Sequence, residues 1–335
     1  MKVTDCQELS IPYYEHGYNL KVNSCINYTI SGAAGKFNKN NYDLYNALWC
    51  LYSNYRIEQN DKRKVILHKL GLELEEIAVD CFENCIEHIK ASIDQGFPAF
   101  FPTNFKCLFF RRDDYESLKE GGYHWLLFSG YENSTQRFIL RDFAVNEKEF
   151  RFFTSAHIFS VYFVTKEIFQ DIYNRTEKLF LYENYKYLKK IYSMRPISFV
   201  EPYTNEMLLN DYISMAESKE NKFTTLIRLF KNLNMTEREL ILSRSAFQFS
   251  YEPLFIMLER LLFSYVDEER NRNYDNLKHV FLEARNTVLS LMHKCIITDT
   301  YSDKLCEYID IIEENDRQML DYIKSVIKNT ASNLK

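Results

Sequence analysis

Two residues with complementary chemistry stand at the two ends of one apolar pattern. His124 opens the run HWLLFSGY, Asp142 lies near the end of the run RFILRDF, and the polar segment ENSTQ separates the two runs. Apolar, β-prone runs joined by a short polar turn predict a β-hairpin. Because the ends of a hairpin come back together, we expect Asp142 to lie beside His124 and to orient its imidazole as a base.

A thiol is the nucleophile that this pair would serve. Cys25 lies near the start of the segment NSCINYTISGAAG, which predicts a helix that ends between Gly32 and Gly35. The positive end of a helix dipole and a neighbouring imidazolium both favour the thiolate form of cysteine. The small residues 31–34 would let this helix pack closely against a sheet.

The composition changes along the chain and divides it into two parts. All eight glycines lie between Gly17 and Gly130, and residues 131–335 contain none. Residues 241–249, 253–266, 276–296 and 304–327 carry apolar side chains at three- and four-residue spacing, which predicts helices. The first part mixes helical segments with β-prone ones. We therefore expect an α+β domain with an antiparallel sheet over residues 1–166 and a mainly helical domain over residues 167–335.

Within the first part, the sequence predicts further elements around the hairpin. Helices are expected at 42–54 and at 81–96, where Gly96 closes the second of them. Strands are expected at 97–103, 107–112 and 158–165.

The order of Cys25, His124 and Asp142 along these elements resembles that of papain-like cysteine enzymes. The pattern H-W-x-x-x-x-G-Y, followed by a strand that ends in aspartate, is similar to the bacteriocin leader-peptidase branch, and the resemblance covers residues 10–165. More narrowly, this part resembles the N-terminal domain of the butirosin-biosynthesis acyltransferase family and a related amide-forming enzyme of closthioamide assembly.

The resemblance implies a papain-like fold and an acyltransferase that forms amide bonds in the nonribosomal biosynthesis of an antibiotic. Cys25, His124 and Asp142 would be the catalytic triad. An acyl group would pass from the phosphopantetheine thioester of an acyl or peptidyl carrier protein to Cys25, and then to a small amine such as a diamine or amino sugar. In the family a glutamine six residues before the cysteine helps to form the oxyanion hole, and Asn19 occupies that position here.

The basic residues after position 185 and the helical second half of the chain suggest where partners would bind. The segment YKYLKKIYSMR is expected to be a basic helix, and an acidic carrier protein would dock on Lys186, Lys189, Lys190 and Arg195. A solvated helix face is the alternative reading of these charges. The helical half would cover the site, hold the acceptor or form the carrier dock. No bound cofactor and no metal are expected.

Two other functions stay open. A papain-like cysteine peptidase or amidase would use the same triad without a carrier protein, and a catalytically idle scaffold would serve as a binding module. A rival constellation is Cys81, Cys85 and His88, which share one helix face and could supply three zinc ligands, although no fourth ligand is evident. His157 could compete as the base, but no carboxylate lies near it in the sequence.

Charge and hydropathy exclude several classes of protein. A net charge of −5 argues against a dedicated nucleic-acid binder. No apolar run approaches the roughly 20 residues of a membrane span, and the first residues lack the pattern of a secretory signal. We therefore expect a cytoplasmic protein whose eight cysteines are reduced thiols.

Overall fold

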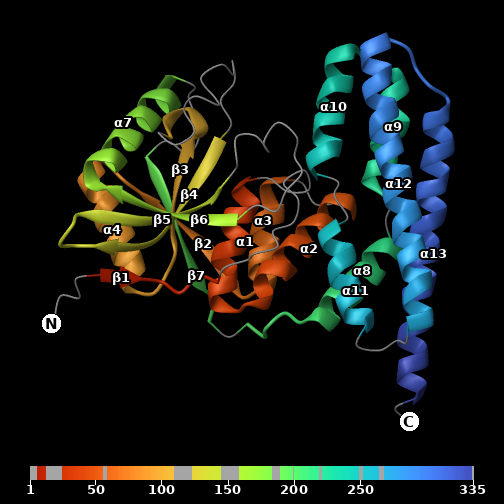
Figure 1. Cartoon of the computed structure of the whole chain (residues 1–335), viewed down its shortest axis with the longest axis horizontal. Coiled ribbons are helices and arrows are strands. Elements are labelled where there is room, and N and C mark those ends of the chain that lie inside the picture. The colour runs from red at the N-terminus through yellow and green to blue at the C-terminus, as the bar shows by residue number, and fades with distance from the viewer. Residues whose placement is uncertain are drawn as a thin grey trace. The chain divides into compact units, whose positions relative to one another are not determined.

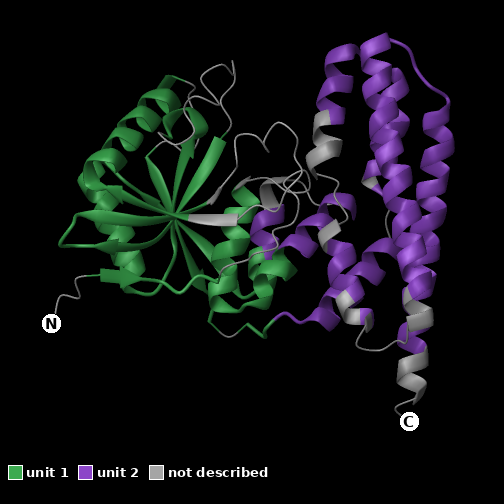
Figure 2. Cartoon of the chain, in the orientation of Figure 1, with its two compact units in different colours: residues 1–20, 24–45, 67–202 green, residues 21–23, 46–66, 203–335 purple. Residues whose placement is uncertain are grey.

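The computed structural model describes most of the chain in ten segments. These are residues 6–12, 25–55, 59–108, 123–144, 158–182, 189–198, 200–218, 221–248, 252–263 and 268–333. Clustering of contacts divides the chain into two compact units, which Figure 2 shows in green and purple. The first comprises residues 1–20, 24–45 and 67–202, and the second comprises residues 21–23, 46–66 and 203–335.

The first unit contains an antiparallel sheet of seven strands (Figure 1). The strands are β1 (Cys6–Glu8), β2 (Leu72–Ala78), β3 (Ala99–Asn104), β4 (Tyr123–Glu132), β5 (Arg137–Ala144), β6 (Ile158–Thr165) and β7 (Lys190–Pro196). They lie in the order β2-β7-β3-β4-β5-β6, and β1 pairs with β4 outside that path. The expected α+β class and antiparallel sheet are confirmed, since every described strand pair is antiparallel.

Helices flank this sheet. They are α1 (Cys25–Phe37), α4 (Phe82–Asp94) and α7 (Lys166–Tyr182), while α2 (Asn40–Tyr55) and α3 (Gln59–Lys69) are divided between the two units. α4 forms as the sequence indicates: its buried apolar residues recur every three or four positions, and the chain leaves it through Gly96, whose φ of +84° favours glycine.

The two faces of the sheet are covered by different helices. On one face, Phe169 of α7 packs against Phe101, Phe128 and Phe138 of three neighbouring strands, with ring centroids 4.8–5.5 Å apart. α4 lies on the same side as α7, and α1 lies on the other side (Figure 1). Aromatic packing of this kind forms one layer of the core between α7 and the central strands, and buried residues of α1 such as Ile30 and Ala33 form another on the opposite face.

The second unit is helical in the part of the chain that the structure describes. Its elements are α8 (Asn205–Ser218), α9 (Lys222–Leu229), α10 (Met235–Gln248), α11 (Glu252–Phe263), α12 (Glu268–Thr298) and α13 (Lys304–Asn333), with a 3-10 turn at Phe230–Asn232. The expected helical character of the C-terminal half is therefore confirmed for these residues. Apolar residues at helical spacing bury the facing sides of α12 and α13, including Val288, Met292, Ile309 and Ile312.

The domain boundary expected near Lys166 differs from this division. Lys166 begins α7 inside the first unit, which continues through β7 to Pro202, and residues 46–66 group with the second unit. The sequence did not reveal this arrangement because β7 pairs with β2 and β3, more than 90 residues earlier in the chain. Pairing over such a separation leaves no local pattern.

Some predicted elements also differ in detail. The segment 107–112 was expected to be a strand, but Cys107 ends a 3-10 turn (Phe105–Cys107) and residues 109–112 lie outside the described residues. The expected basic helix over YKYLKKIYSMR is wrong for its second half, which forms β7. α1 continues past Gly32 and Gly35 to Phe37, since its small residues are buried against the sheet and packing there outweighs helix propensity.

Candidate functional site

The β4–β5 hairpin brings the expected histidine and aspartate together. Pairing runs from Glu132 opposite Arg137, beside the turn, to Leu127 opposite Arg141, with a bulge between Phe128 and Gly130. Beyond this last pair the register places Asp142 diagonally across from His124. Both side chains then point to the same face of the sheet, at a distance that long side chains can bridge.

The two side chains form a buried hydrogen bond. Nε2 of His124 lies 3.0 Å from Oδ2 of Asp142, and both side chains have no exposed surface. A carboxylate can only accept a hydrogen bond, so Nε2 carries the proton and Nδ1 presents its lone pair in the neutral ring. This is the tautomer that a general base needs, and the expected pairing is therefore present in the structure.

An aromatic ring holds the imidazole in place. Phe105 stacks on His124 with ring centroids 4.4 Å apart and an interplanar angle of 25°. Phe105 begins the 3-10 turn that follows β3, and the turn is capped by Asn104, whose Oδ1 accepts a hydrogen bond of 3.0 Å from the Lys106 N–H. Sequence reasoning placed a strand near this turn and missed the contact, although Asn104 is a typical cap residue.

α1 lies against the strand that carries the histidine. Cys25 is the first residue of α1, and Thr29, one turn later, donates its hydroxyl to the carbonyl of Trp125 at 3.4 Å. Asn27 accepts a hydrogen bond of 3.2 Å from the hydroxyl of Tyr45. The start of the expected helix is confirmed to within two residues, whereas the side chain of Cys25 and all of Asn19 lie outside the described residues.

The residues expected to dock a carrier protein lie at and within β7, apart from Lys186, which is outside the described residues. Lys189 pairs with Glu177 at 3.7 Å, Lys190 pairs with Glu76 at 2.6 Å, and Arg195 pairs with Glu75. An acidic partner already faces each of the three cations, so their combined positive field is weaker than the sequence alone indicates.

The rival zinc constellation is not assembled. Cys85 is fully buried while Cys81 is exposed, and burial raises the pKa of the Cys85 thiol far above its usual range, which disfavours a thiolate ligand. Within the described segments, no group of three or more His, Cys, Asp or Glu residues is arranged to hold a metal ion. His157, the rival base, lies outside the described residues.

A buried arginine beside the pair escaped the sequence analysis. Arg141 precedes Asp142, and its guanidinium donates to the hydroxyl of Ser129 at 3.2 Å, to the carbonyl of Ile11 at 3.1 Å and to the carboxylate of Glu8 at 3.2 Å. These bonds tie the N-terminal segment to β4 and β5. The signal available in the sequence was a charged residue directly after the apolar run Phe138–Leu140, because a charge that is buried in a strand must find partners.

None of the described helices combines the length and apolar character that a membrane-spanning segment requires. No protein-family model matches the chain, and no curated protein is significantly similar to it.

Proposed function

We propose that the first unit is a papain-like cysteine acyltransferase that forms amide bonds. The observation that supports this most directly is the buried hydrogen bond of 3.0 Å between His124 and Asp142, on a strand against which a helix beginning at Cys25 packs. A base that is oriented by a carboxylate and a thiol at a helix N-terminus form the usual pair for covalent acyl transfer.

The two ring nitrogens of His124 would have different tasks. Nε2 stays bonded to Asp142, and Nδ1 takes the thiol proton of Cys25. The thiolate attacks the carbonyl carbon of an acyl thioester, and the backbone N–H of Cys25, with Asn19 as a second donor, stabilises the oxyanion. The bond from the carbonyl carbon to the donor sulfur breaks, and the departing thiol receives the proton from His124. An amine then attacks the acyl-enzyme, loses its proton to His124 and releases the Cys25 sulfur.

For the triad to form, the N-terminus of α1 must bring Cys25 to His124, although α1 and the His124 side chain lie on opposite faces of the sheet. Strand alternation places His124 on the same face of β4 as Phe128, which α7 covers, whereas Thr29 of α1 meets β4 from the other side. The thiol of Cys25 must therefore approach the imidazole at the end of β4, before the described pairing with β5 starts at Leu127. The 3.4 Å contact of Thr29 with the Trp125 carbonyl brings α1 to this end of β4, where Trp125 and His124 pair with Pro102 and Thr103 of β3.

The acyl donor in this proposal is a carrier protein whose phosphopantetheine arm holds the thioester. The acceptor is a small free amine. Docking on Lys189, Lys190 and Arg195 remains part of the proposal, but their existing ion pairs would have to open or to share their cations with the carrier. A papain-like peptidase would use the same three residues on a peptide substrate, and the following experiment separates the two activities.

The test is intact-protein mass spectrometry after the full chain is mixed with acyl-loaded carrier protein. We expect an acyl adduct on the wild-type chain and none on Cys25→Ala. Cys81→Ala is the matched control, because Cys81 is an exposed thiol of the same unit and its removal should leave the adduct in place. An adduct on Cys25→Ala, or no adduct on a wild-type chain whose Cys25 still reacts with iodoacetamide, would reject the transferase. Cleavage of peptides in the second case would favour the peptidase.

A further inference from the structure

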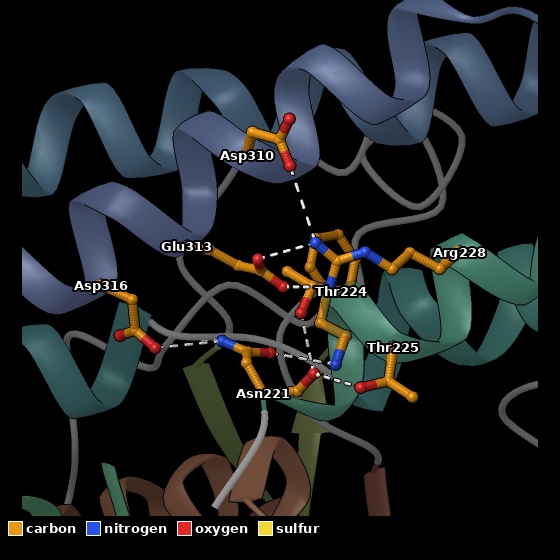
Figure 3. A network of polar contacts seen from close by, with 8 residues as sticks. Asn221, Thr224, Thr225, Arg228, Asp310, Glu313 and Asp316 are labelled. Carbon is orange, nitrogen blue, oxygen red and sulfur yellow. Dashed lines mark hydrogen bonds and ion pairs between the residues drawn. The ribbon is translucent and has the colours of Figure 1, made fainter. Parts of the chain in front are cut away.

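A polar cavity lies within the second unit, at the junction of α8, α9 and α13. Its volume is about 320 Å³, which is at the lower end of the range for small-molecule sites. The residues that line it are Ala216, Asn221, Arg228, Glu313, Asp316, Arg317 and Leu320. Figure 3 shows Asn221, Arg228, Glu313 and Asp316 of this group, together with the neighbouring Thr224, Thr225 and Asp310. All of them belong to the same compact unit.

Asp316 is one of the two carboxylates that line this cavity, and its hydrogen-bond partners are uncharged. The hydroxyl of Tyr55 donates to both of its oxygens, at 2.9 and 2.7 Å, and the side-chain amide of Asn221 donates at 3.3 Å. The orientation of that amide is fixed, because its oxygen caps α9 by accepting the Phe223 N–H at 3.0 Å. Within the described part of the chain, no cationic side chain pairs with Asp316.

The nearby cations are engaged with other acids. Arg228 makes a two-pronged ion pair with Glu313, at 2.5 and 2.8 Å, and lies 3.6 Å from Asp310. Arg317 pairs with Glu314 at 2.9 Å. Both guanidiniums that line the cavity are thus paired with carboxylates other than that of Asp316.

A partly buried carboxylate without a cation is an incomplete ion pair. Burial raises the pKa of Asp316, which shows how unfavourable its isolated charge is in this environment. An ammonium group beside it would offset that cost by a charge-assisted hydrogen bond. A carboxylate has about four acceptor positions, and the two donors present leave room for another.

We propose that this cavity binds a small aliphatic amine in its ammonium form. The ammonium nitrogen lies against the carboxylate of Asp316, and the alkyl chain packs on Ala216 and Leu320, the two apolar residues of the wall. The proposal does not depend on the activity of His124, because every group that it uses belongs to the second unit.

Isothermal titration of the full chain with n-butylamine at neutral pH tests this directly. Butan-1-ol and butanoate have nearly the same shape but are neutral and anionic. We expect the amine to bind at least tenfold more tightly than either, because a hydrogen bond to a charged group contributes about 1.5–3 kcal/mol, equivalent to roughly 10- to 100-fold. This comparison uses only the wild-type chain and does not require any variant to fold.

Matched variants then locate the site. Asp316→Asn removes the charge and should weaken amine binding by about tenfold or more, whereas Asp310→Asn makes the same change of charge on an exposed residue of the same helix and should change it less than about twofold. Ala216→Leu should also weaken binding, because it fills the cavity without altering charge. Equal binding of butanoate, an unchanged affinity in Asp316→Asn, or no binding of the amine at millimolar concentration would overturn the proposal.

Discussion

The phenyl ring of Phe105 lies on the imidazole of His124, 4.4 Å away between centroids, and so fixes the plane in which Nδ1 points. The bond to Asp142 fixes the rotation of the ring within that plane. Two contacts from different elements thus determine the direction of one lone pair. Such support is needed at a site where a small misplacement of the base would slow proton transfer strongly.

Loss of the aromatic face should therefore affect turnover more than binding. For Phe105→Leu we expect a severalfold fall in the rate of acyl transfer with little change in the KM for the carrier, because the base is misaligned but substrate contacts stay. Stability should also fall by about 1–2 kcal/mol in urea unfolding, from lost stacking and packing. Phe97→Leu, in a loop of the same unit, is the control. An unchanged transfer rate in Phe105→Leu would show that the ring has no positioning role.

Asp142 should contribute through its charge as well as its hydrogen bond. Asp142→Asn preserves the shape of the side chain but removes the carboxylate that stabilises the imidazolium and fixes the tautomer, so we expect acyl transfer to fall by about two orders of magnitude or more. The measurement is single-turnover acylation of Cys25. Asp94→Asn, which changes an exposed carboxylate of the same unit, should leave the rate within about twofold. Wild-type rates in Asp142→Asn would remove Asp142 from the mechanism.

Local patterns in the sequence were sufficient for the hairpin of the candidate site, but not for the turn that carries Phe105. The two apolar, β-prone runs on either side of ENSTQ predicted the hairpin and the meeting of His124 with Asp142, because strand pairing across a short turn depends on neighbouring residues only. The spacing of apolar residues likewise predicted α4 and the long C-terminal helices.

Features that depend on distant residues were not predictable in this way. The segment that forms β7 was expected to be part of a basic helix, yet its backbone pairs with β2, where Ile191 lies opposite Ile77. The hydrogen bond between Tyr55 and Asp316 joins residues 261 positions apart, and nothing near Asp316 in the sequence distinguishes it from a solvated helix residue. Tertiary context decides both cases.

Gly130 lies where β1 pairs with β4, and any larger side chain there should destabilise the fold. A Cβ added there would lie 2.5 Å from the carbonyl oxygen of Gln7 and 2.9 Å from Cδ1 of Ile139, so the backbone of β1 would have to move. We expect Gly130→Ala to lower the free energy of unfolding by about 1–3 kcal/mol, as overpacking does. In Gly96→Ala, where no atom lies within 4 Å but φ is +84°, the loss should be about 1 kcal/mol from backbone strain alone. A smaller loss for Gly130→Ala than for Gly96→Ala would contradict the steric account.

The raised pKa of Asp316 predicts how the second unit responds to pH. Burial is its main cause and the charge of Glu313 adds to it, while the bonds from Tyr55 and Asn221 act in the opposite direction. Because the folded pKa lies above the unfolded value of 3.8, the folded state keeps this proton over a range in which the unfolded state has lost it. The stabilisation is therefore complete below the unfolded pKa and is lost as the pH rises through the folded pKa.

Asp316→Asn should accordingly gain stability relative to the wild type as the pH rises from about 4 to 7, in urea unfolding followed by far-UV circular dichroism. The ion pair of Arg228 with Glu313 and the exposed Arg317 remain in this variant, so the difference reports on Asp316 itself. Asp310→Asn, which removes an exposed carboxylate of the same helix, is the control. Saturating n-butylamine should reduce the wild-type loss, since an ammonium ion stabilises the ionised carboxylate. A constant difference between Asp316→Asn and the wild type across this pH range would show that Asp316 titrates alike in the folded and unfolded states.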